Sequence, residues 1–170
     1  MKYSSFKLAP LSASHDYAAF SCGSLPLDRY IKEQATQDIR RRIASCFVAA
    51  DAHNRVTGYY TLASASVPLA DFPPTVIKKL PRYPSIPAVR IGRLAVDQAF
   101  KGLGLGKALL GNATYRAANS EIASFALIVD AKDESAVAFY RHHDFIAFPG
   151  TPSILFLPLA KFAFNQTKVS

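Results

Sequence analysis

The chain carries the sequence VRIGRLAVD at residues 89–97, then QAF at 98–100 and KGLGLGK at 101–107. An apolar, partly alternating segment leads into a turn that holds three glycines between two lysines, and a helix-forming segment follows. Unpaired backbone N–H groups at the start of a helix bind anions, and glycine lets the main chain approach such a ligand with φ > 0. This stretch therefore predicts a phosphate-bearing ligand that is held mainly by main-chain atoms.

Two common phosphate motifs are excluded at this position. A P-loop that used Gly106 and Lys107 would need glycine at 101 and Ser or Thr at 108, where the chain has Lys101 and Ala108. The dinucleotide fingerprint would place its third glycine one residue later, and no acidic residue lies at 122–126 to bind a ribose hydroxyl. From these residues alone, the remaining alternative is a turn that only joins a strand to a helix.

Length and composition indicate one globular domain over residues 1–170, with a frayed tail from about Asn165. Half of the 170 residues are hydrophobic and 19% are charged. We expect a cytoplasmic protein without membrane contact, because the sequence shows neither a transmembrane-length apolar run nor a signal-peptide pattern. Cys22, Cys46 and the four histidines lack metal-ligand spacing, so no metal is expected.

The net charge of +8 suggests a polyanionic partner. The alternative is a basic protein that has no such partner. A connection at 68–88 holds six prolines and several cations, and loops of this length inside a compact domain are often functional.

Hydrophobic patterning predicts an α/β (α+β) fold with one mixed sheet. The expected strands are 3–11, 45–51, 56–67, 89–97, 125–130, 145–148 and 153–157. The expected helices are a short one that ends at Gly23, then 26–42, 75–80, 107–119 and 134–143.

Two segments together resemble the acetyl-CoA site of the GNAT N-acetyltransferases. They are residues 93–107, which include RLAVD and KGLGLGK, and AFYRHHDF at 138–145. Lys101 stands where the family has Arg or Gln, and Asp144 stands where glycine is usual; we expect the second change to matter little to the chemistry. Over residues 45–158 the resemblance implies the GNAT fold, which is a central mixed, mostly antiparallel twisted sheet flanked by helices.

A narrower resemblance lies nearer the N-terminus. The sequences FSCG at 20–23, LDRYI at 27–31 and QA at 34–35 are similar to the opening of GNAT toxins from bacterial toxin–antitoxin pairs. This resemblance implies acetylation of the amino group of the amino acid on charged tRNA, which stops translation. It also implies a ribbon-helix-helix antitoxin as partner, a homodimer, and contact with operator DNA only through the antitoxin complex.

The resemblance makes acetyl-CoA the co-substrate. The amides of the glycine loop and the following helix N-terminus would hold its pyrophosphate. The main chain at 94–96 could pair with the pantetheine amides as an added strand would, and a backbone N–H there could polarise the thioester carbonyl. The predicted cofactor-binding residues are Leu94, Ala95, Val96, Lys101, Gly102, Leu103, Gly104, Leu105, Gly106, Lys107 and Phe139.

Tyr140 is the expected catalytic residue, because a neutral hydroxyl can protonate the departing thiolate. For Phe139 the alternative is simple core packing. Asp97, Glu134 and His142 are candidate general bases by residue type, and spacing places none of them. A base is dispensable for an esterified amino acid, since its amine should have a pKa below the roughly 7.7–8.0 of a free α-amino group.

Basic residues on the expected acceptor side are the candidates for contact with tRNA phosphates. They are Arg40, Arg41, Lys78, Lys79, Arg82, Arg90 and Arg93. Arg93 is expected nearest the reacting ester, while for each arginine a solvated surface charge is the alternative. Two rival functions stay open: a GNAT enzyme that acts on a small amine or a protein N-terminus, and a basic module that binds nucleotide or nucleic acid without turnover.

Overall fold

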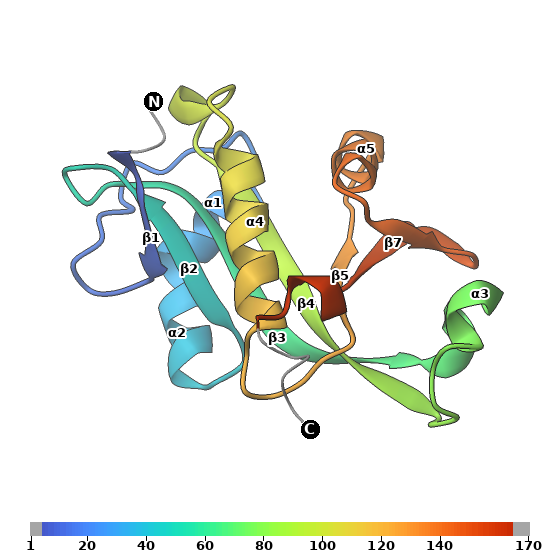
Figure 1. The fold of residues 1–170 in the computed structure, drawn as a ribbon. Helices are drawn as coiled ribbons and strands as arrows, with labels where there is room; N and C mark the ends of the chain where they lie inside the picture. The colour runs from blue at the N-terminus through green and yellow to red at the C-terminus, as the bar shows by residue number, and fades with distance from the viewer. Residues whose placement is uncertain (1–4, 165–170) are drawn as a thin grey trace. The chain divides into compact units, whose positions relative to one another are not determined.

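The computed structural model describes residues 5–164, which form two compact units. Unit 1 holds the described residues up to 63 together with 92–113, and unit 2 holds 64–91 and those from 114 onward. Two long strands, β3 (Val56–Pro68) and β4 (Ser85–Val96), contribute to both units. The seven strands are hydrogen-bonded in the order β1-β2-β3-β4-β5-β7-β6 (Figure 1). The β4–β5 pair is parallel, whereas β1–β2, β2–β3, β5–β7 and β6–β7 are antiparallel, which confirms the mixed sheet.

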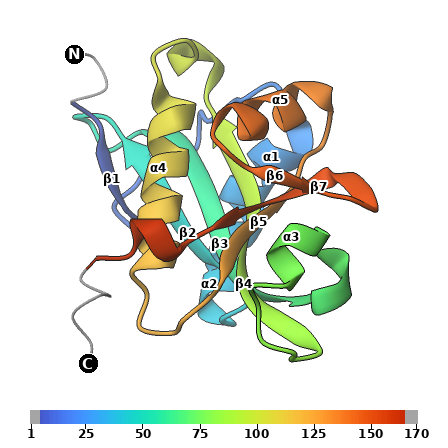
Figure 2. The ribbon, with the colours of Figure 1, turned by 45° about the vertical axis from the view of Figure 1, so that its right-hand side comes forward.

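In unit 1, helices cover both faces of the strands. Besides its parts of β3 and β4, the unit contains β1 (Lys7–Pro10) and β2 (Ser45–Ala50). The Tyr59 ring stacks on Tyr30 at 6.2 Å between centroids, and the Tyr60 hydroxyl donates to Asn112 Oδ1 at 2.6 Å. Successive strand residues point to opposite faces. The helical segments α1 (Leu25–Arg29), η2 (Tyr30–Gln34) and α2 (Ala35–Arg40) therefore cover one face, and α4 (Leu105–Ala118) covers the other (Figure 2).

Gly58 allows α4 to pack closely on β3. A Cβ at this position would lie 2.9 Å from Leu109 Cδ1 and 3.1 Å from the Ala95 carbonyl oxygen. Real Cβ atoms rarely approach other atoms so closely, so a larger residue would push the helix away from the strand.

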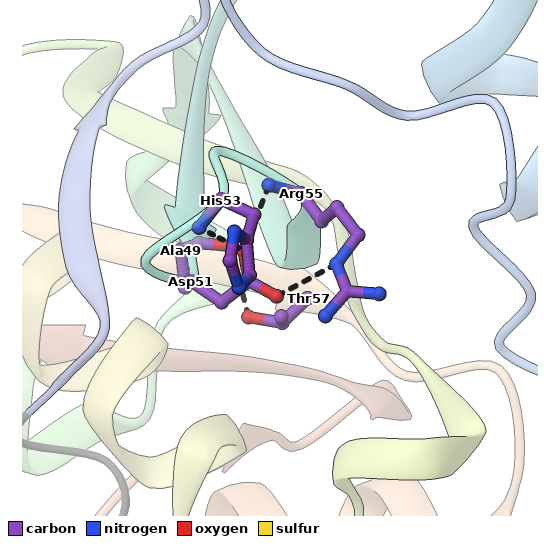
Figure 3. A network of polar contacts seen from close by, with 5 residues as sticks. All are labelled: Ala49, Asp51, His53, Arg55 and Thr57. Carbon is purple, nitrogen blue, oxygen red and sulfur yellow. Dashed lines mark hydrogen bonds and ion pairs between the residues drawn. The ribbon is translucent and has the colours of Figure 1, made fainter.

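The turn between β2 and β3 is fixed by one carboxylate (Figure 3). Asp51 Oδ1 accepts from the backbone N–H groups of His53 and Arg55 at 2.9 and 3.0 Å, and Asp51 Oδ2 pairs with Arg55 Nε at 2.9 Å. Burial tends to raise the pKa of Asp51, but these hydrogen bonds outweigh it, so its pKa lies below the usual range. Beside the turn, the Thr57 hydroxyl donates to the Ala49 carbonyl at 2.9 Å, where the β2–β3 register shifts.

Unit 2 is built around Phe72. Its ring contacts those of Phe125, Phe148 and Phe156, with centroids 5.1–5.6 Å apart. Phe72 follows the short helix η3 (Leu69–Asp71) and precedes α3 (Pro74–Ile77). The proline-rich connection thus supplies core residues as well as surface. The other elements of the unit are β5 (Ala126–Asp130), α5 (Glu134–His142), β6 (Ile146–Phe148), β7 (Thr151–Pro158) and η5 (Ala160–Phe162).

Several predicted boundaries differ from the structure. The short helix expected to end at Gly23 is wrong: the residues before Gly23 form turns, although Gly23 does take φ +93°. The helix expected at 26–42 is present but contains the π-helical segment η2, and α4 begins at Leu105 rather than at residue 107. The strand expected at 89–97 begins at Ser85. Residues 3 and 4 of the first expected strand, and the tail expected to fray from 165, lie outside the described residues.

None of the helices within residues 5–164 combines the length and the apolar character needed to cross a membrane.

Candidate functional site

The second half of β4 has no partner on β5. The parallel register runs from Ala88↔Ala126 to Ile91↔Val129 and ends there, while β4 continues to Val96. The Ala95 side chain is 5% exposed and belongs to the core of unit 1, so Ala95 can meet a ligand only through its main chain. A strand edge of this kind can accept an extended amide-bearing ligand as an added strand.

The glycine loop that follows β4 is open. Gly102 and Gly104 both take φ +81°, and a Cβ built on either would meet no atom within 4 Å. The Ala108 N–H donates to the Gly104 carbonyl at 3.1 Å, which begins the hydrogen bonding of α4. Gly106 lies inside the first turn of that helix rather than in the loop. Free N–H groups of the loop and the first helical turn, with open space in front of them, fit a pyrophosphate.

Two predicted cofactor residues have side chains that serve the fold. Leu105 is 2% exposed, and its side chain packs at Gly58, so only its main chain is available to a ligand. Lys101 Nζ donates to the Cys22 carbonyl at 3.0 Å, which ties the glycine loop to the segment before α1. Lys107 is exposed on the first turn of α4, and Leu103 is half-buried.

The structure argues against Asp97 as a general base. Asp97 Oδ1 accepts from the Ala99 N–H at 2.9 Å and Oδ2 accepts from the Ser21 N–H at 3.0 Å, so the carboxylate caps a turn and holds the Ser21 segment. Glu134 lies six residues before Tyr140 on α5, roughly 9 Å along the helix axis. His142 follows Tyr140 by two residues, a spacing at which helical side chains do not face each other.

Tyr140 lies near the end of α5 in an apolar setting. It is 6% exposed, and its ring makes edge contacts with Phe139 and Phe145, both with centroids 5.2 Å away. Burial raises the pKa of its hydroxyl to about 12, so this phenol is neutral at physiological pH. Among residues 5–164, none accepts a hydrogen bond from it. Phe139 also contacts the His143 ring at 4.9 Å and remains half-buried.

Asp144 holds the turn that follows α5. Its φ is +72°, in the left-handed region that favours glycine. The turn closes when the Phe145 N–H donates to the Tyr140 carbonyl at 3.1 Å, and this brings the Phe145 ring against Tyr140. Glycine is usual at this position in the GNAT pattern that the sequence resembles, and its role there is to allow this backbone conformation. The spacing of residues in the sequence did not reveal that role.

The predicted tRNA-binding residues divide between the units. In unit 1, Arg40 and Arg41 are exposed at the end of α2, whereas the Arg93 guanidinium lies 3.6 Å from the Tyr30 ring centroid. In unit 2, three exposed cations occupy the connection between β3 and β4, and Arg90 is half-buried on β4. The three exposed residues are Lys78, Lys79 and Arg82.

Unit 2 also contains a cleft of about 540 Å³ that the sequence did not single out. Its apolar lining includes Phe72, Ile77, Ile128 and Phe148, and Arg90 reaches it from β4. The six prolines of the connection between β3 and β4 were the sequence feature that could have pointed to this cleft, because that segment forms one side of it. Within the described part of the chain, no three His, Cys, Asp or Glu side chains gather as metal ligands would.

Comparison with known proteins shows the family of the chain. A family model described as an acetyltransferase (GNAT) domain matches residues 18–153. The chain belongs to the GNAT acetyltransferase family. The chain is therefore an acetyl-CoA-dependent N-acetyltransferase.

Individual relatives of this GNAT chain are similar over nearly its whole length. The tRNA-acetylating toxin of Mycobacterium tuberculosis is 38% identical over 149 residues, covering 86% of this chain and 88% of the toxin. The solved structure of AtaT complexed with acetyl-methionyl-tRNAfMet has a TM-score of 0.83 at 29% identity, covering 90% and 94% of the two chains. A tyrosine-to-phenylalanine mutant of AtaT bound to the C-terminus of the antitoxin AtaR and acetyl-CoA has a TM-score of 0.77 at 25% identity, covering 93% and 96%.

Proposed function

We propose that this GNAT enzyme is a toxin that transfers acetyl from acetyl-CoA to the α-amino group of aminoacyl-tRNA and so blocks translation. The observation that carries the proposal is the 38% identity to a tRNA-acetylating toxin, spread over 86% of this chain. The similarity to AtaT with its acetylated tRNA product supports the same substrate class. Residues 1–170 would act as one catalytic domain.

Main-chain groups hold the donor in this proposal. The N–H groups of Gly102 and Gly104 and of the first turn of α4 bind the pyrophosphate, with Lys107 adding positive charge. The edge of β4 at 94–96 pairs with the pantetheine amides, and a backbone N–H there polarises the thioester carbonyl. The open space at both glycines supports this assignment, since a bulky pyrophosphate needs close access to the main chain.

The acceptor amine attacks the thioester carbonyl, and the C–S bond breaks. An amine next to an ester has a lowered pKa, so much of it is neutral at physiological pH and can lose its proton to water after attack. The departing CoA thiolate takes a proton from the Tyr140 hydroxyl, which the high pKa keeps protonated. Water then returns a proton to the tyrosinate. No base on the protein is required.

Cations on the protein surface bind the tRNA backbone in this proposal. The candidates are Arg40, Arg41, Lys78, Lys79, Arg82 and Arg90, and Arg93 would contribute only with the part of its guanidinium that Tyr30 leaves free. Binding through phosphates weakens steeply as salt rises. The enzyme would be cytoplasmic and dimeric, and a ribbon-helix-helix antitoxin would neutralise it and carry it to operator DNA. The antitoxin-bound structure of AtaT supports this kind of partner.

The test is acetyl transfer from labelled acetyl-CoA to total charged tRNA. We expect label on an aminoacyl group and a fall in kcat of roughly 10²–10⁴ for Tyr140→Phe. Tyr115→Phe is the matched control, because it removes a hydroxyl from a tyrosine that is 61% exposed on α4. Label on a polyamine or a protein N-terminus with none on charged tRNA would replace this proposal with the small-amine or protein-acetylating function.

A further inference from the structure

The thioester end of the donor lies toward Arg93 if β4 holds the pantetheine as proposed. The glycine loop follows β4, so a pyrophosphate bound there sets one end of the donor at the C-terminal end of the strand. The pantetheine then runs back along the edge at 94–96, and the next residue in that direction is Arg93. The loop, this part of β4 and the helical segments α1, η2 and α2 all belong to unit 1. A side chain at position 93 is therefore close to where an acceptor must meet the thioester.

The Arg93 guanidinium is covered on one face by Tyr30. Its Cζ lies 3.6 Å from the centroid of the Tyr30 ring, and Arg93 is half-buried. A guanidinium that lies over a ring uses its face for that contact, so the contact does not block its in-plane N–H groups. Within residues 5–164, no carboxylate forms an ion pair with this guanidinium and no group accepts a hydrogen bond from it. Its planar fork of donors is therefore available to an anion.

The Tyr30 ring has little freedom to move. It is 4% exposed and stacks on Tyr59 with 6.2 Å between the ring centroids. Its hydroxyl donates to Asp38 Oδ2 at 2.8 Å, and Gln34 Nε2 donates to Asp38 Oδ1 at 2.9 Å. The hydrogen bonds from Gln34 and then from Tyr30 keep the pKa of Asp38 below its usual range. A ring held in this way restricts the position of the guanidinium that lies over it.

Asp38 fixes the ring without pairing with the cation. Each of its carboxylate oxygens already accepts a hydrogen bond, one from Tyr30 and one from Gln34. The positive charge of Arg93 is thus left for a ligand. A charged tRNA carries phosphodiesters close to its aminoacyl ester, and an arginine fork can bind two phosphate oxygens at once.

We propose that Tyr30 is a positioning residue: its ring holds the Arg93 guanidinium beside the thioester, where the fork binds a phosphate of the charged tRNA. The inference rests on the proposed function, since it concerns the acceptor of the same reaction. Arg93 touches the substrate, whereas Tyr30 acts through Arg93, and Asp38 acts through Tyr30.

Steady-state kinetics on the charged tRNA that the wild-type enzyme acetylates tests this role. Arg93→Ala is expected to raise KM for charged tRNA about 10–100-fold, the range for one charge-assisted hydrogen bond. Tyr30→Leu is expected to raise it about tenfold, whereas Tyr30→Phe, which keeps the ring, should raise it by about threefold at most. KM for acetyl-CoA and kcat should stay close to the wild-type values in all three variants.

Three further variants distinguish positioning from packing. Phe20→Leu is the matched control, because Phe20 is 1% exposed, lies in the same core cluster and contacts the Tyr59 ring. It should lower stability and leave KM for charged tRNA unchanged. Arg93→Lys keeps the charge but lacks the planar fork, so it should raise KM for charged tRNA as Tyr30→Leu does. In the double variant Arg93→Ala/Tyr30→Leu, loss of the ring should add nothing to loss of the guanidinium.

The outcomes separate the two proposals. A non-additive rise in KM for charged tRNA that Phe20→Leu does not show supports the positioning role of Tyr30. A rise in KM for acetyl-CoA instead would assign the guanidinium to the phosphates of the donor and overturn the inference. Additive effects, or an unchanged KM for charged tRNA in Arg93→Lys and Tyr30→Leu, also overturn it and leave the proposed function standing. No acetylation of any charged tRNA by the wild-type enzyme overturns both.

Discussion

The Arg93 guanidinium lies over the face of the Tyr30 ring, 3.6 Å from its centroid, and the Tyr30 hydroxyl donates to Asp38 Oδ2 at 2.8 Å. A cation, an aromatic ring and a carboxylate thus connect β4 to η2 and α2 within unit 1. Burial, followed by the hydrogen bond to Asp38, raises the pKa of Tyr30, so its hydroxyl stays a donor across the physiological range.

Arg93→Ala should destabilise the protein. Loss of the cation–π contact is expected to lower the free energy of unfolding by about 1 kcal/mol, measured by urea denaturation. Arg41→Ala, at an exposed position, should change it by less than about 0.5 kcal/mol. Equal stabilities of the two variants, together with a weaker salt dependence of tRNA binding in Arg93→Ala than in the wild type, would show that Arg93 serves the tRNA rather than the fold.

Gly104→Ala should weaken acetyl-CoA binding without a steric clash. At φ +81° an L-residue costs about 1–2 kcal/mol, so the loop would relax away from the conformation that presents its N–H groups. We expect KM for acetyl-CoA to rise about tenfold, and calorimetry with CoA to show the same loss. Gly111→Ala is the control. If the two variants bind CoA equally well, the loop is not the pyrophosphate site.

Asp144→Gly should stabilise the protein, because glycine takes φ +72° without Cβ strain. The expected gain is about 0.5–1 kcal/mol in the free energy of unfolding, and Asp144→Ala should instead lose stability. Thermal unfolding of the three proteins tests the order. Acetyl transfer should change little, since the Asp144 side chain has no proposed part in the reaction.

The carboxylate of Asp51 gives a pH-dependent prediction. Its folded-state pKa lies below the ordinary value of an aspartate, so its stabilising effect is complete above that ordinary value and is lost as pH falls through the folded pKa. Asp51→Asn should lower the free energy of unfolding by about 1–2 kcal/mol at neutral pH. The difference from wild type should shrink below roughly pH 4. A difference that stays constant from pH 7 to pH 2.5 would contradict this role.

Local patterns in the sequence determined much of the structure at the proposed acetyl-CoA site. A strand followed by glycines and a helix predicted an anion site, and the structure has β4, an open loop with Gly102 and Gly104 at positive φ, and then α4. These features are local, because they depend on glycine conformation and on helix N–H groups that belong to neighbouring residues. The order of strands and helices followed from periodicity for the same reason.

Tertiary structure decided what each side chain is free to do. In the sequence, Lys101 and Arg93 are both cations near the proposed acetyl-CoA site. In the structure, Lys101 donates to the Cys22 carbonyl, whereas the Arg93 guanidinium lies over the Tyr30 ring. Asp97 has the residue type of a general base, yet its Oδ2 accepts a hydrogen bond from the Ser21 N–H. These partners lie tens of residues away along the chain, so no local pattern specifies them. The cleft beside Arg90 likewise exists only because β3, β4, β5, β7 and the proline-rich connection meet, and packing between distant segments sets its size and its lining.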